Sequence, residues 1–298
     1  MSEIRIIEVG PRDGLQNEAT PIPTDAKIEF IRALRDAGLR EIEATSFVSP
    51  KWVPQLGDAA ELWPQLPPGP LYSALVPNVK GLERAIELGV ERIALFTAAS
   101  DAFTQQNINM TVDQSLEVFG DVIRQFRAAQ PSGWIRGYVS TIFECPYAGP
   151  VAPVSVMRVA AALFDMGVDE VSLGDTTGVG TPRDVRAVHA EISSLGGHNR
   201  VAWHFHDTRG TAISNVAAAL ELGCGAFDSS SAGLGGCPYA VGAGGNLATD
   251  DLVYFLEHEG IKTGVDPIKL SQASLPILKA LGRIPASKAQ QALLSKKA

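Results

Sequence analysis

A regular alternation of strand-like and helix-like segments runs along nearly the whole chain, and it constrains the fold more than any other feature. Eight short segments rich in apolar and β-branched residues have the composition of buried strands: Ile4–Gly10, Glu41–Phe47, Leu71–Val76, Arg92–Ala98, Ile135–Thr141, Glu170–Thr176, Val201–Asp207 and Ala226–Leu234. Longer segments with apolar residues at helical spacing lie between them: Thr24–Ala37, Val79–Leu88, Val112–Ala129, Pro153–Met166, Pro182–Leu195 and Thr211–Leu222. Alternating strands and helices are typical of parallel β/α units, and eight units predict a closed (β/α)8 TIM barrel.

Glycines at the ends of the predicted helices support this repeat. In four places an apolar residue and a glycine directly precede the next strand: Ala37-Gly38, Leu88-Gly89, Met166-Gly167 and Leu222-Gly223. Glycine readily adopts the left-handed conformation that ends a helix. A doubly wound open sheet is the alternative, but such sheets more often carry Gly-x-Gly-x-x-Gly after the first strand, where this chain has Gly-Pro-Arg-Asp-Gly (10–14).

The barrel accounts for most of the chain's length. At about 150 residues per domain, 298 residues would allow two domains, but no linker rich in Ser, Gly or Pro divides them. A further helix is predicted near Leu247–Glu259, and helical spacing resumes from about Asp266. We therefore expect one catalytic domain over residues 1–298, with a helical C-terminal appendage from about residue 262. A cap or an oligomer contact is the expected role of this appendage, and a homodimer is the expected assembly.

Charge and cysteine content narrow the partners. The 25 basic and 33 acidic residues give a net charge of −8, and no long Lys/Arg cluster is present. Nucleic acid and an anionic membrane surface are therefore not expected as partners. No run of 18 apolar residues and no signal peptide is found, and three cysteines without a Cys-x-x-Cys pair predict neither a disulfide framework nor a zinc site. We expect a reduced, cytoplasmic protein.

Polar residues gather where the predicted strands end, the face that carries the active site in parallel barrels. They are Arg12, Asp13, Glu43, Ser46, Asp175, His204, His206 and Asn246. His204 and His206 are two apart on one strand, so both side chains point to the same face and can reach one ion. Taken alone, a His-x-His pair is as often structural as it is a ligand pair.

The placement of the histidine pair opposite Asp13 favours a metal site. Asp13 adds an anionic oxygen and Asn246 a neutral one, which leaves positions for water or substrate in an octahedron. This donor set favours Mg²⁺ or Mn²⁺ over structural zinc, which prefers thiolates and a closed tetrahedron. The four predicted ligands are therefore Asp13, His204, His206 and Asn246.

Arg12, beside Asp13, is either half of a surface ion pair or an active-site cation. Gly10, Pro11 and Gly14 supply a turn that lets both side chains enter the site. An arginine at a barrel mouth suits a developing oxyanion such as an enolate. Glu43 and Asp175 are each either the buried partner of Arg12 or a proton carrier.

The segment 233–246 contains six glycines and Cys237. It is either an ordinary flexible loop or a lid over bound substrate, and it lacks the Gly-Lys-Ser/Thr ending of a phosphate-binding loop. We predict that Cys237 acts as an acid or base, whereas Cys145 and Cys224 are structural. Ser46, Gly235, Gly236 and Arg12 are the candidate substrate contacts.

Five stretches together resemble the hydroxymethylglutaryl-CoA lyase family. They are Val-Gly-Pro-Arg-Asp-Gly-Leu-Gln-Asn-Glu (9–18), Glu-Ala-Thr-Ser-Phe-Val-Ser-Pro-Lys-Trp-Val-Pro-Gln (43–55), Ser-Leu-Gly-Asp-Thr-Thr-Gly-Val-Gly-Thr-Pro (172–182), His-Phe-His-Asp-Thr (204–208) and Gly-Leu-Gly-Gly-Cys-Pro-Tyr-Ala (233–240). They span residues 9 to about 255 in order. Arg-Asp-Gly and His-x-His alone would fit a wider group of metal-dependent barrels.

The resemblance implies a (β/α)8 barrel that uses Mg²⁺ or Mn²⁺ to cleave 3-hydroxy-3-methylglutaryl-CoA into acetyl-CoA and acetoacetate, a step of leucine degradation. It implies the same four metal ligands, with Arg12 stabilising the thioester enolate and Cys237 in proton transfer. Glu43 and Asp175 would complete the site. Arg209, where many family members have Tyr or a small residue, and Ala19, where a basic residue is common, depart from the family pattern.

Two other functions compete with the lyase. An acetyl-CoA-dependent Claisen condensing enzyme resembling isopropylmalate or homocitrate synthase shares Arg-Asp-Gly and His-x-His, but such enzymes are usually longer. A catalytically silent barrel is disfavoured because Arg12, Asp13 and His204 are all present. Within the lyases, a substrate with a longer acyl chain, such as an isohexenylglutaryl-CoA, is the remaining alternative.

Overall fold

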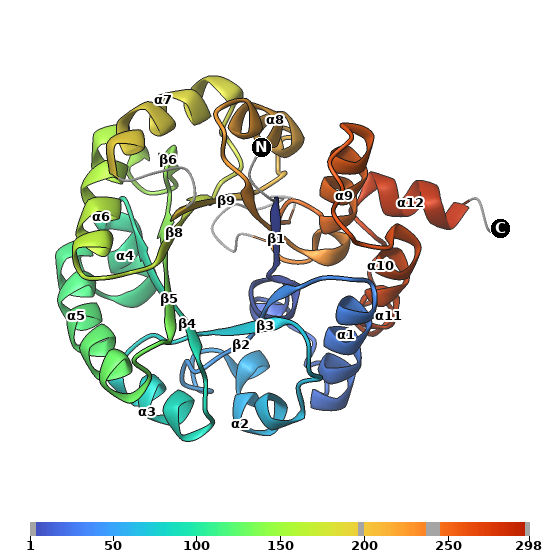
Figure 1. Cartoon of the computed structure of the whole chain (residues 1–298), viewed down its shortest axis with the longest axis horizontal. Helices are drawn as coiled ribbons and strands as arrows, with labels where there is room; N and C mark the ends of the chain where they lie inside the picture. Colours follow the sequence, from blue (N-terminus) through green and yellow to red (C-terminus); the bar gives the residue numbers. More distant parts are fainter. Residues whose placement is uncertain (1–3, 196–199, 237–244, 296–298) are drawn as a thin grey trace.

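Eight parallel strands close into a barrel at the centre of the molecule, seen in a computed structural model that describes residues 4–195, 200–236 and 245–295 (Figure 1). Around the barrel the strands follow one another in the order β1-β10-β9-β8-β5-β4-β3-β2. Their bounds are β1 (Arg5–Glu8), β2 (Glu41–Ser46), β3 (Leu71–Leu75), β4 (Arg92–Ala98), β5 (Trp134–Ser140), β8 (Glu170–Asp175), β9 (Val201–Phe205) and β10 (Ala226–Ser229). The predicted fold class is confirmed.

Helices surround the strands as a ring, with the C-terminal helices beside α1 (Figure 1). The helices of the ring are α1 (Thr24–Asp36), α2 (Ala59–Leu62), α3 (Val79–Glu87), α4 (Asp101–Ile108), α5 (Val112–Ala129), α6 (Pro153–Asp165), α7 (Pro182–Ile192), α8 (Ala212–Glu221) and α9 (Thr249–His258). The four glycines predicted to end helices, Gly38, Gly89, Gly167 and Gly223, have φ between +67° and +106°. Their expected left-handed conformation is therefore confirmed.

Successive side chains along a barrel strand point alternately toward the surrounding helices and into the barrel. On β5, Ile135 and Val139 pack into the apolar layer between strands and helices, whereas Arg136 and Tyr138 are buried inside the barrel. A period of two is the rule for β-strands, and β2 departs from regular pairing between Glu43 and Thr45, where its register with β3 shifts. Charged residues in otherwise apolar strands are therefore the residues that fill the barrel interior.

The last barrel strand is shorter than predicted. β10 ends at Ser229, and residues Ser231–Gly233 form a 3-10 turn in which Ala232 has φ +61°. The backbone N–H of Ala232 donates to the carboxylate of Asp250 on α9, so this buried donor of the turn has a partner. The apolar residues up to Leu234 are thus buried in a turn rather than in a strand.

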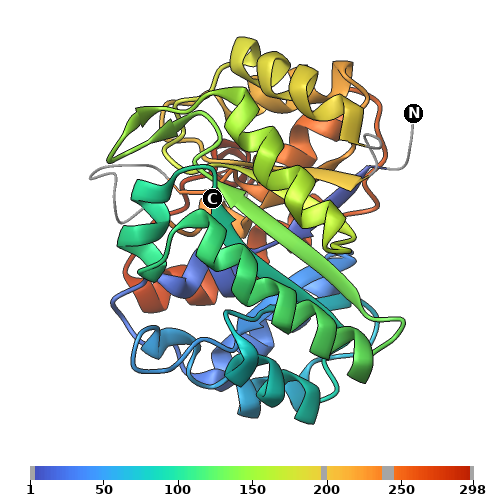
Figure 2. The same ribbon diagram turned by 90° about the vertical axis from the view of Figure 1, so that its left-hand side faces the viewer.

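One insertion follows β5. Strands β6 (Glu144–Cys145) and β7 (Gly149–Pro150) form a two-stranded antiparallel hairpin, which projects from the body of the molecule at the left of Figure 2. Cys145 lies in this hairpin and Cys224 precedes β10, and both thiols are buried. Their burial agrees with the structural role predicted for them.

The C-terminal appendage consists of three short helices, α10 (Pro267–Ala273), α11 (Leu275–Leu281) and α12 (Lys288–Ser295). It is attached to the barrel through the N–H of Asp266, which donates to the carbonyl of Ala37 at the end of α1 (2.7 Å). Arg283, between α11 and α12, pairs with Glu18 at 2.7 Å. Among the described residues, no helix has both the length and the apolar character needed to cross a bilayer.

Candidate active site

A π-helical turn after β1 carries Arg12 and Asp13 into the mouth of the barrel. The turn covers Gly10–Gly14, and the N–H groups of Arg12, Asp13 and Gly14 all donate to the carbonyl of Val9. A β-carbon at Gly14 would lie 2.8 Å from Ser230 Oγ, so only glycine lets the turn pack this closely against the segment after β10. The turn predicted from Gly10, Pro11 and Gly14 is present, and it is a π-helical turn, wider than an ordinary β-turn.

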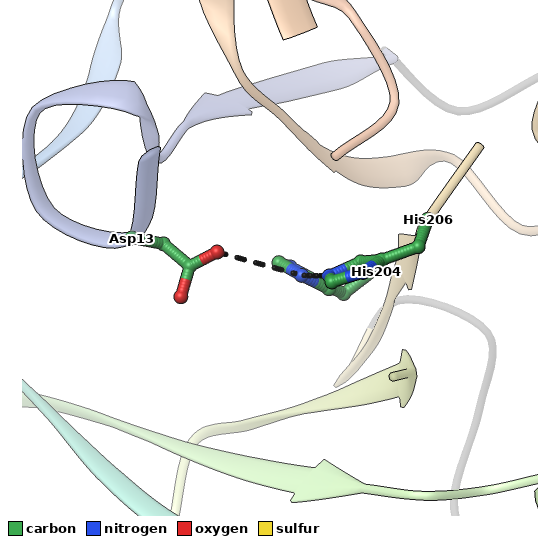
Figure 3. A group of neighbouring side chains, drawn as sticks. All are labelled: Asp13, His204 and His206. Atoms are coloured by element: carbon green, nitrogen blue, oxygen red, sulfur yellow. Dashed lines mark hydrogen bonds and ion pairs between the residues drawn. The ribbon is translucent and has the colours of Figure 1, made fainter. Parts of the chain in front are cut away.

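His204 and His206 lie at the end of β9 and face Asp13 (Figure 3). Their Nε2 atoms are 3.3 Å apart, and Nε2 of His204 is 3.9 Å from Oδ2 of Asp13. One ligand atom from each of the three residues lies within 4.8 Å of the other two. Side chains from strands on opposite sides of β10 thus converge on one point, as the sequence predicts.

Asn246 completes this group from the segment before α9. It forms an isolated bridge with His206, and its Nδ2 donates to Oδ2 of Asp13 at 2.9 Å and to the carbonyl of Leu234 at 3.1 Å. Its Oδ1 is buried and has no hydrogen-bond partner among the described residues. A buried acceptor without a donor is costly, and a cation would satisfy it.

The charge states of Asp13 and His206 also fit a cation. For His204, burial acts to lower the pKa, but the hydrogen bond with Asp228 and the charge of Asp13 raise it. Burial acts to raise the pKa of Asp13, but Arg12 and the two imidazoles outweigh it and hold that pKa at about 2. Burial, with His204 beside it, lowers the pKa of His206 to about 4. An ionised carboxylate, a neutral imidazole and a free amide oxygen are the forms in which these side chains bind divalent cations.

Glu43 is the buried partner of Arg12. Oε1 of Glu43 accepts from Nε of Arg12, and its Oε2 accepts from the hydroxyl of Tyr138 at 3.0 Å. Nη1 of Arg12 donates to Oδ1 of Asp13 at 2.7 Å, and the arginine is only 4% exposed. The neighbouring carboxylates, Glu43 first, raise the pKa of Arg12 against the effect of burial. Arg12 is therefore a fixed cation within the site and not half of a surface pair.

Asp175 has a different set of partners. Its carboxylate accepts from the backbone N–H groups of Val179 (3.2 Å) and Gly180 (2.9 Å), in the loop after β8. Burial raises its pKa to about 6 despite these hydrogen bonds. The geometry therefore assigns the role of arginine partner to Glu43 and leaves Asp175 holding its own loop.

The candidate substrate contacts lie around the same mouth. Ser46 is fully buried, and its hydroxyl accepts from the N–H of Val48. Gly235 has φ +104°, and a β-carbon there would lie 2.7 Å from Nδ2 of Asn246. Asn17 approaches the carbonyl of Gly236 at 3.4 Å. Cys237 lies outside the described residues.

The two departures from the family pattern are both at the surface. Arg209, in the loop after β9, is exposed and donates through Nη1 to the carbonyl of Thr177 at 2.9 Å. Ala19 is exposed on the loop after β1. Neither residue contacts the Asp13–His204–His206 group in the described contacts.

Sequence reasoning missed two buried residues, Arg136 and Asp228, that link Tyr138 to His204 inside the barrel. Arg136 donates through Nη1 to the Tyr138 hydroxyl (3.3 Å), and its Nη2 is 2.8 Å from Oδ1 of Asp228. Oδ2 of Asp228 is 3.2 Å from Nδ1 of His204. We call the closed circuit of side chains the lumen ring; its members are Asp13, Arg12, Glu43, Tyr138, Arg136, Asp228 and His204. A charged residue in the middle of a buried strand is the signal that marks Arg136 and Asp228.

The family model described as HMGL-like matches residues 3–277. The mitochondrial hydroxymethylglutaryl-CoA lyase of Bos taurus is 49% identical over 292 residues, which cover 97% of this chain and 89% of the bovine protein. A 3-hydroxy-3-isohexenylglutaryl-CoA/hydroxy-methylglutaryl-CoA lyase of Pseudomonas aeruginosa is also 49% identical, covering 99% and 98%.

A solved structure extends the comparison to the whole fold. The HMG-CoA lyase of Acinetobacter baumannii, in complex with coenzyme A and 3-methylmalate, superposes with a TM-score of 0.91 at 38% identity, covering 97% of this chain and 95% of that one. Family model, sequence identity and fold agree over nearly the full length. The chain belongs to the HMGL-like family.

Proposed function

We propose that this protein is a divalent-cation-dependent carbon–carbon lyase that cleaves 3-hydroxy-3-methylglutaryl-CoA into acetyl-CoA and acetoacetate. The observation that carries the proposal is the convergence of Asp13, His204 and His206 beside the fixed cation Arg12. Two relatives that are each 49% identical to this chain are named as lyases of this substrate. Because these relatives are lyases, the condensing-enzyme alternative is not favoured.

The donor set fits Mg²⁺ or Mn²⁺. Asp13, His204, His206 and Asn246 would hold the ion, and the buried Oδ1 of Asn246 is an acceptor otherwise without a partner among the described residues. A bound divalent cation supplies Lewis acidity, which lowers the pKa of a coordinated hydroxyl.

Arg12 would stabilise the enolate that forms when the bond between C2 and C3 breaks. Its guanidinium is held by Glu43 and Asp13 before substrate arrives, so no reorganisation is needed as negative charge develops on the thioester oxygen. Glu43 is thereby an orienting residue in this proposal. The C3 hydroxyl must give up its proton as the bond breaks, and the enolate carbon must then gain one. Asp13 and Cys237 in the glycine loop are the residues proposed for this proton transfer, with Cys237 as the donor to the enolate.

The remaining candidates are assigned by position. Asp175 would shape the loop after β8, while Ser46, Gly235 and Gly236 would line the acyl group and thioester. The acyl-CoA is the proposed substrate because of the family, and one relative structure holds coenzyme A. A single catalytic domain over residues 1–298, a homodimer and a cytoplasmic location remain parts of this proposal that come from the sequence.

The test is a coupled assay for acetoacetate with purified protein, 3-hydroxy-3-methylglutaryl-CoA and either Mg²⁺ or Mn²⁺. We expect turnover with at least one ion and none in excess chelator. No acetoacetate with either ion would contradict the proposal. A parallel assay with 3-hydroxy-3-isohexenylglutaryl-CoA tests the longer substrate, which the Pseudomonas relative carries in its name.

A further inference from the structure

Asp228 lies inside the barrel on β10, where it is the register partner of His204, one of the proposed metal ligands, on β9. The side chain is 1% exposed, and Oδ2 is 3.2 Å from Nδ1 of His204 and accepts from the hydroxyl of Ser172 at 2.7 Å. Oδ1 is 2.8 Å from Nη2 of Arg136. Oδ2 thus has two polar partners and Oδ1 lies at ion-pair distance from Arg136, so three side chains on three other strands hold the carboxylate in place.

The chain of charges continues toward the opposite end of the barrel. Nε of Arg136 is 3.0 Å from Oε1 of Glu170 on β8, and Oε2 of Glu170 accepts from Arg5 on β1. Arg136 and Glu170 are both at most 2% exposed. Removing one member of a buried ion pair leaves its partner charged and unpaired, so each group keeps the next in place.

The contact between Asp228 and His204 determines which ring nitrogen is free. A carboxylate is only an acceptor, so the proton of neutral His204 belongs on Nδ1, and Nε2 faces Asp13 and His206 with its lone pair. An imidazole bound to a metal ordinarily donates its second N–H to such an acceptor, which fixes both tautomer and ring orientation.

We infer that Asp228 is a positioning residue for the divalent cation, and that Glu170, acting through Arg136, holds Asp228 in place from the far end of the barrel. The inference rests on the proposed cation-dependent function. It extends the site by two ion pairs beyond the residues that touch the cation or the substrate. The predicted consequence is a change in cation affinity caused by substitutions far from the barrel mouth.

The experiment measures Mn²⁺ affinity directly, by the loss of the free-ion EPR signal on titration into the full-length protein. In Asp228→Asn the side-chain amide has two orientations. If its oxygen accepts from His204, its NH₂ group faces Arg136. If its NH₂ group faces His204, the proton of His204 must move to Nε2. We expect a Kd for Mn²⁺ raised by about 10- to 100-fold. Glu170→Gln should give a smaller rise in the same direction.

Asp58→Asn is the matched control. Asp58 is a partly buried carboxylate that pairs with the buried Lys27, and it shares no partner with Asp228, Arg136 or Glu170 in the described contacts. Its replacement should lower the thermal unfolding midpoint and leave the Kd for Mn²⁺ unchanged. If Asp228→Asn fails to fold, Ser172→Ala removes only the hydroxyl donor to Asp228 and should still weaken Mn²⁺ binding.

The outcomes separate the two claims. Tight Mn²⁺ binding by the unaltered protein and equal affinity in Asp228→Asn would overturn the inference and leave the proposed function standing. An equal loss of affinity in Asp58→Asn would also overturn it, since general destabilisation would then explain the effect. Absence of Mn²⁺ binding by the unaltered protein would overturn the proposed function and the inference together.

Discussion

Nε2 of His204 and Nε2 of His206 lie 3.3 Å apart, and both face the carboxylate of Asp13. Two nitrogen lone pairs at this separation repel one another unless a proton or a cation lies between them. Burial and His204 lower the pKa of His206 to about 4, so His206 offers its lone pair near neutral pH. Burial acts to lower the pKa of His204, but the hydrogen bond with Asp228 and the charge of Asp13 raise it, so a proton in this contact would come from His204. A divalent cation bound by both nitrogens would displace that proton.

Arg12→Lys should reduce kcat by about 10²- to 10³-fold, the cost of removing one preorganised donor to a developing oxyanion. Lysine keeps the charge opposite Glu43 but cannot also reach Asp13 with a second N–H. The affinity for Mn²⁺ should change little. Arg32→Lys on the exposed face of α1 is the control, and a kcat within threefold of the unaltered protein in Arg12→Lys would count against the role of Arg12.

Cys237→Ser should lower kcat by about 10²- to 10⁴-fold, the range for loss of a general acid. Because the substituted atom is not among the proposed ligands, Mn²⁺ binding should be retained. Cys224→Ser, which changes a buried thiol away from the mouth, should keep its turnover. Steady-state assays of the two variants side by side check this, and near-normal turnover in Cys237→Ser would remove Cys237 from the mechanism.

Gly235→Ala should weaken Mn²⁺ binding while the protein stays folded. The new β-carbon would lie 2.7 Å from Nδ2 of Asn246, and the residue has φ +104°. Gly89→Ala, at φ +67° with no atom within 4 Å of the added β-carbon, carries backbone strain alone and is the control. Calorimetric titration of both variants checks the difference. Equal Mn²⁺ affinity in the two would show that the approach of Gly235 to Asn246 has no bearing on the cation.

Glu8 should make the stability of the protein fall as the pH rises. Burial, opposed by hydrogen bonds from Thr249, Ser231 and Gly10, raises its pKa from 4.5 to about 7, and Asp250 adds a small effect in the same direction. Between pH 4.5 and 7 the folded protein keeps a proton that the unfolded chain releases. The contribution of Glu8 is therefore complete below pH 4.5 and lost as the pH rises through 7.

Glu8→Gln removes this titration without changing the size of the side chain. The free energy of unfolding of the variant, minus that of the unaltered protein, should increase between pH 4.5 and 7, by up to about 3 kcal/mol. Denaturant titrations at several pH values measure it, and groups that do not interact with Glu8 cancel in the difference. A constant difference over this range would contradict the prediction.

The repeating parts of the fold could be predicted from the sequence because each β/α unit carries its own signals. Period-two burial places the strands, and glycine ends the helices before four of them. The end of β10 could not be predicted, since a 3-10 turn that buries Ala232 and Leu234 has the same apolar composition as a strand. Apolar composition indicates that a segment is buried, but it does not give the backbone conformation. Here the conformation of the turn depends on a distant partner, Asp250.

The upper part of the site could be predicted because its residues follow strand ends. Spacing alone left Glu43 and Asp175 equivalent, and only the contact between Glu43 and Arg12 distinguishes them. Asp228 and Arg136 were missed because they lie within their strands, whereas functional residues were sought near the predicted strand ends. The two residues pair with each other although they are 92 residues apart in sequence, and no local sequence pattern contains such a pairing.

The most direct test of the central claim is to follow acetoacetate formation as Mn²⁺ is added to protein freed of metal by chelation. The account predicts no turnover without the ion, and activity that rises in proportion to occupancy up to one Mn²⁺ per chain, with His206→Ala shifted to much higher Mn²⁺ concentrations. Full cleavage of 3-hydroxy-3-methylglutaryl-CoA by the metal-free protein would contradict it.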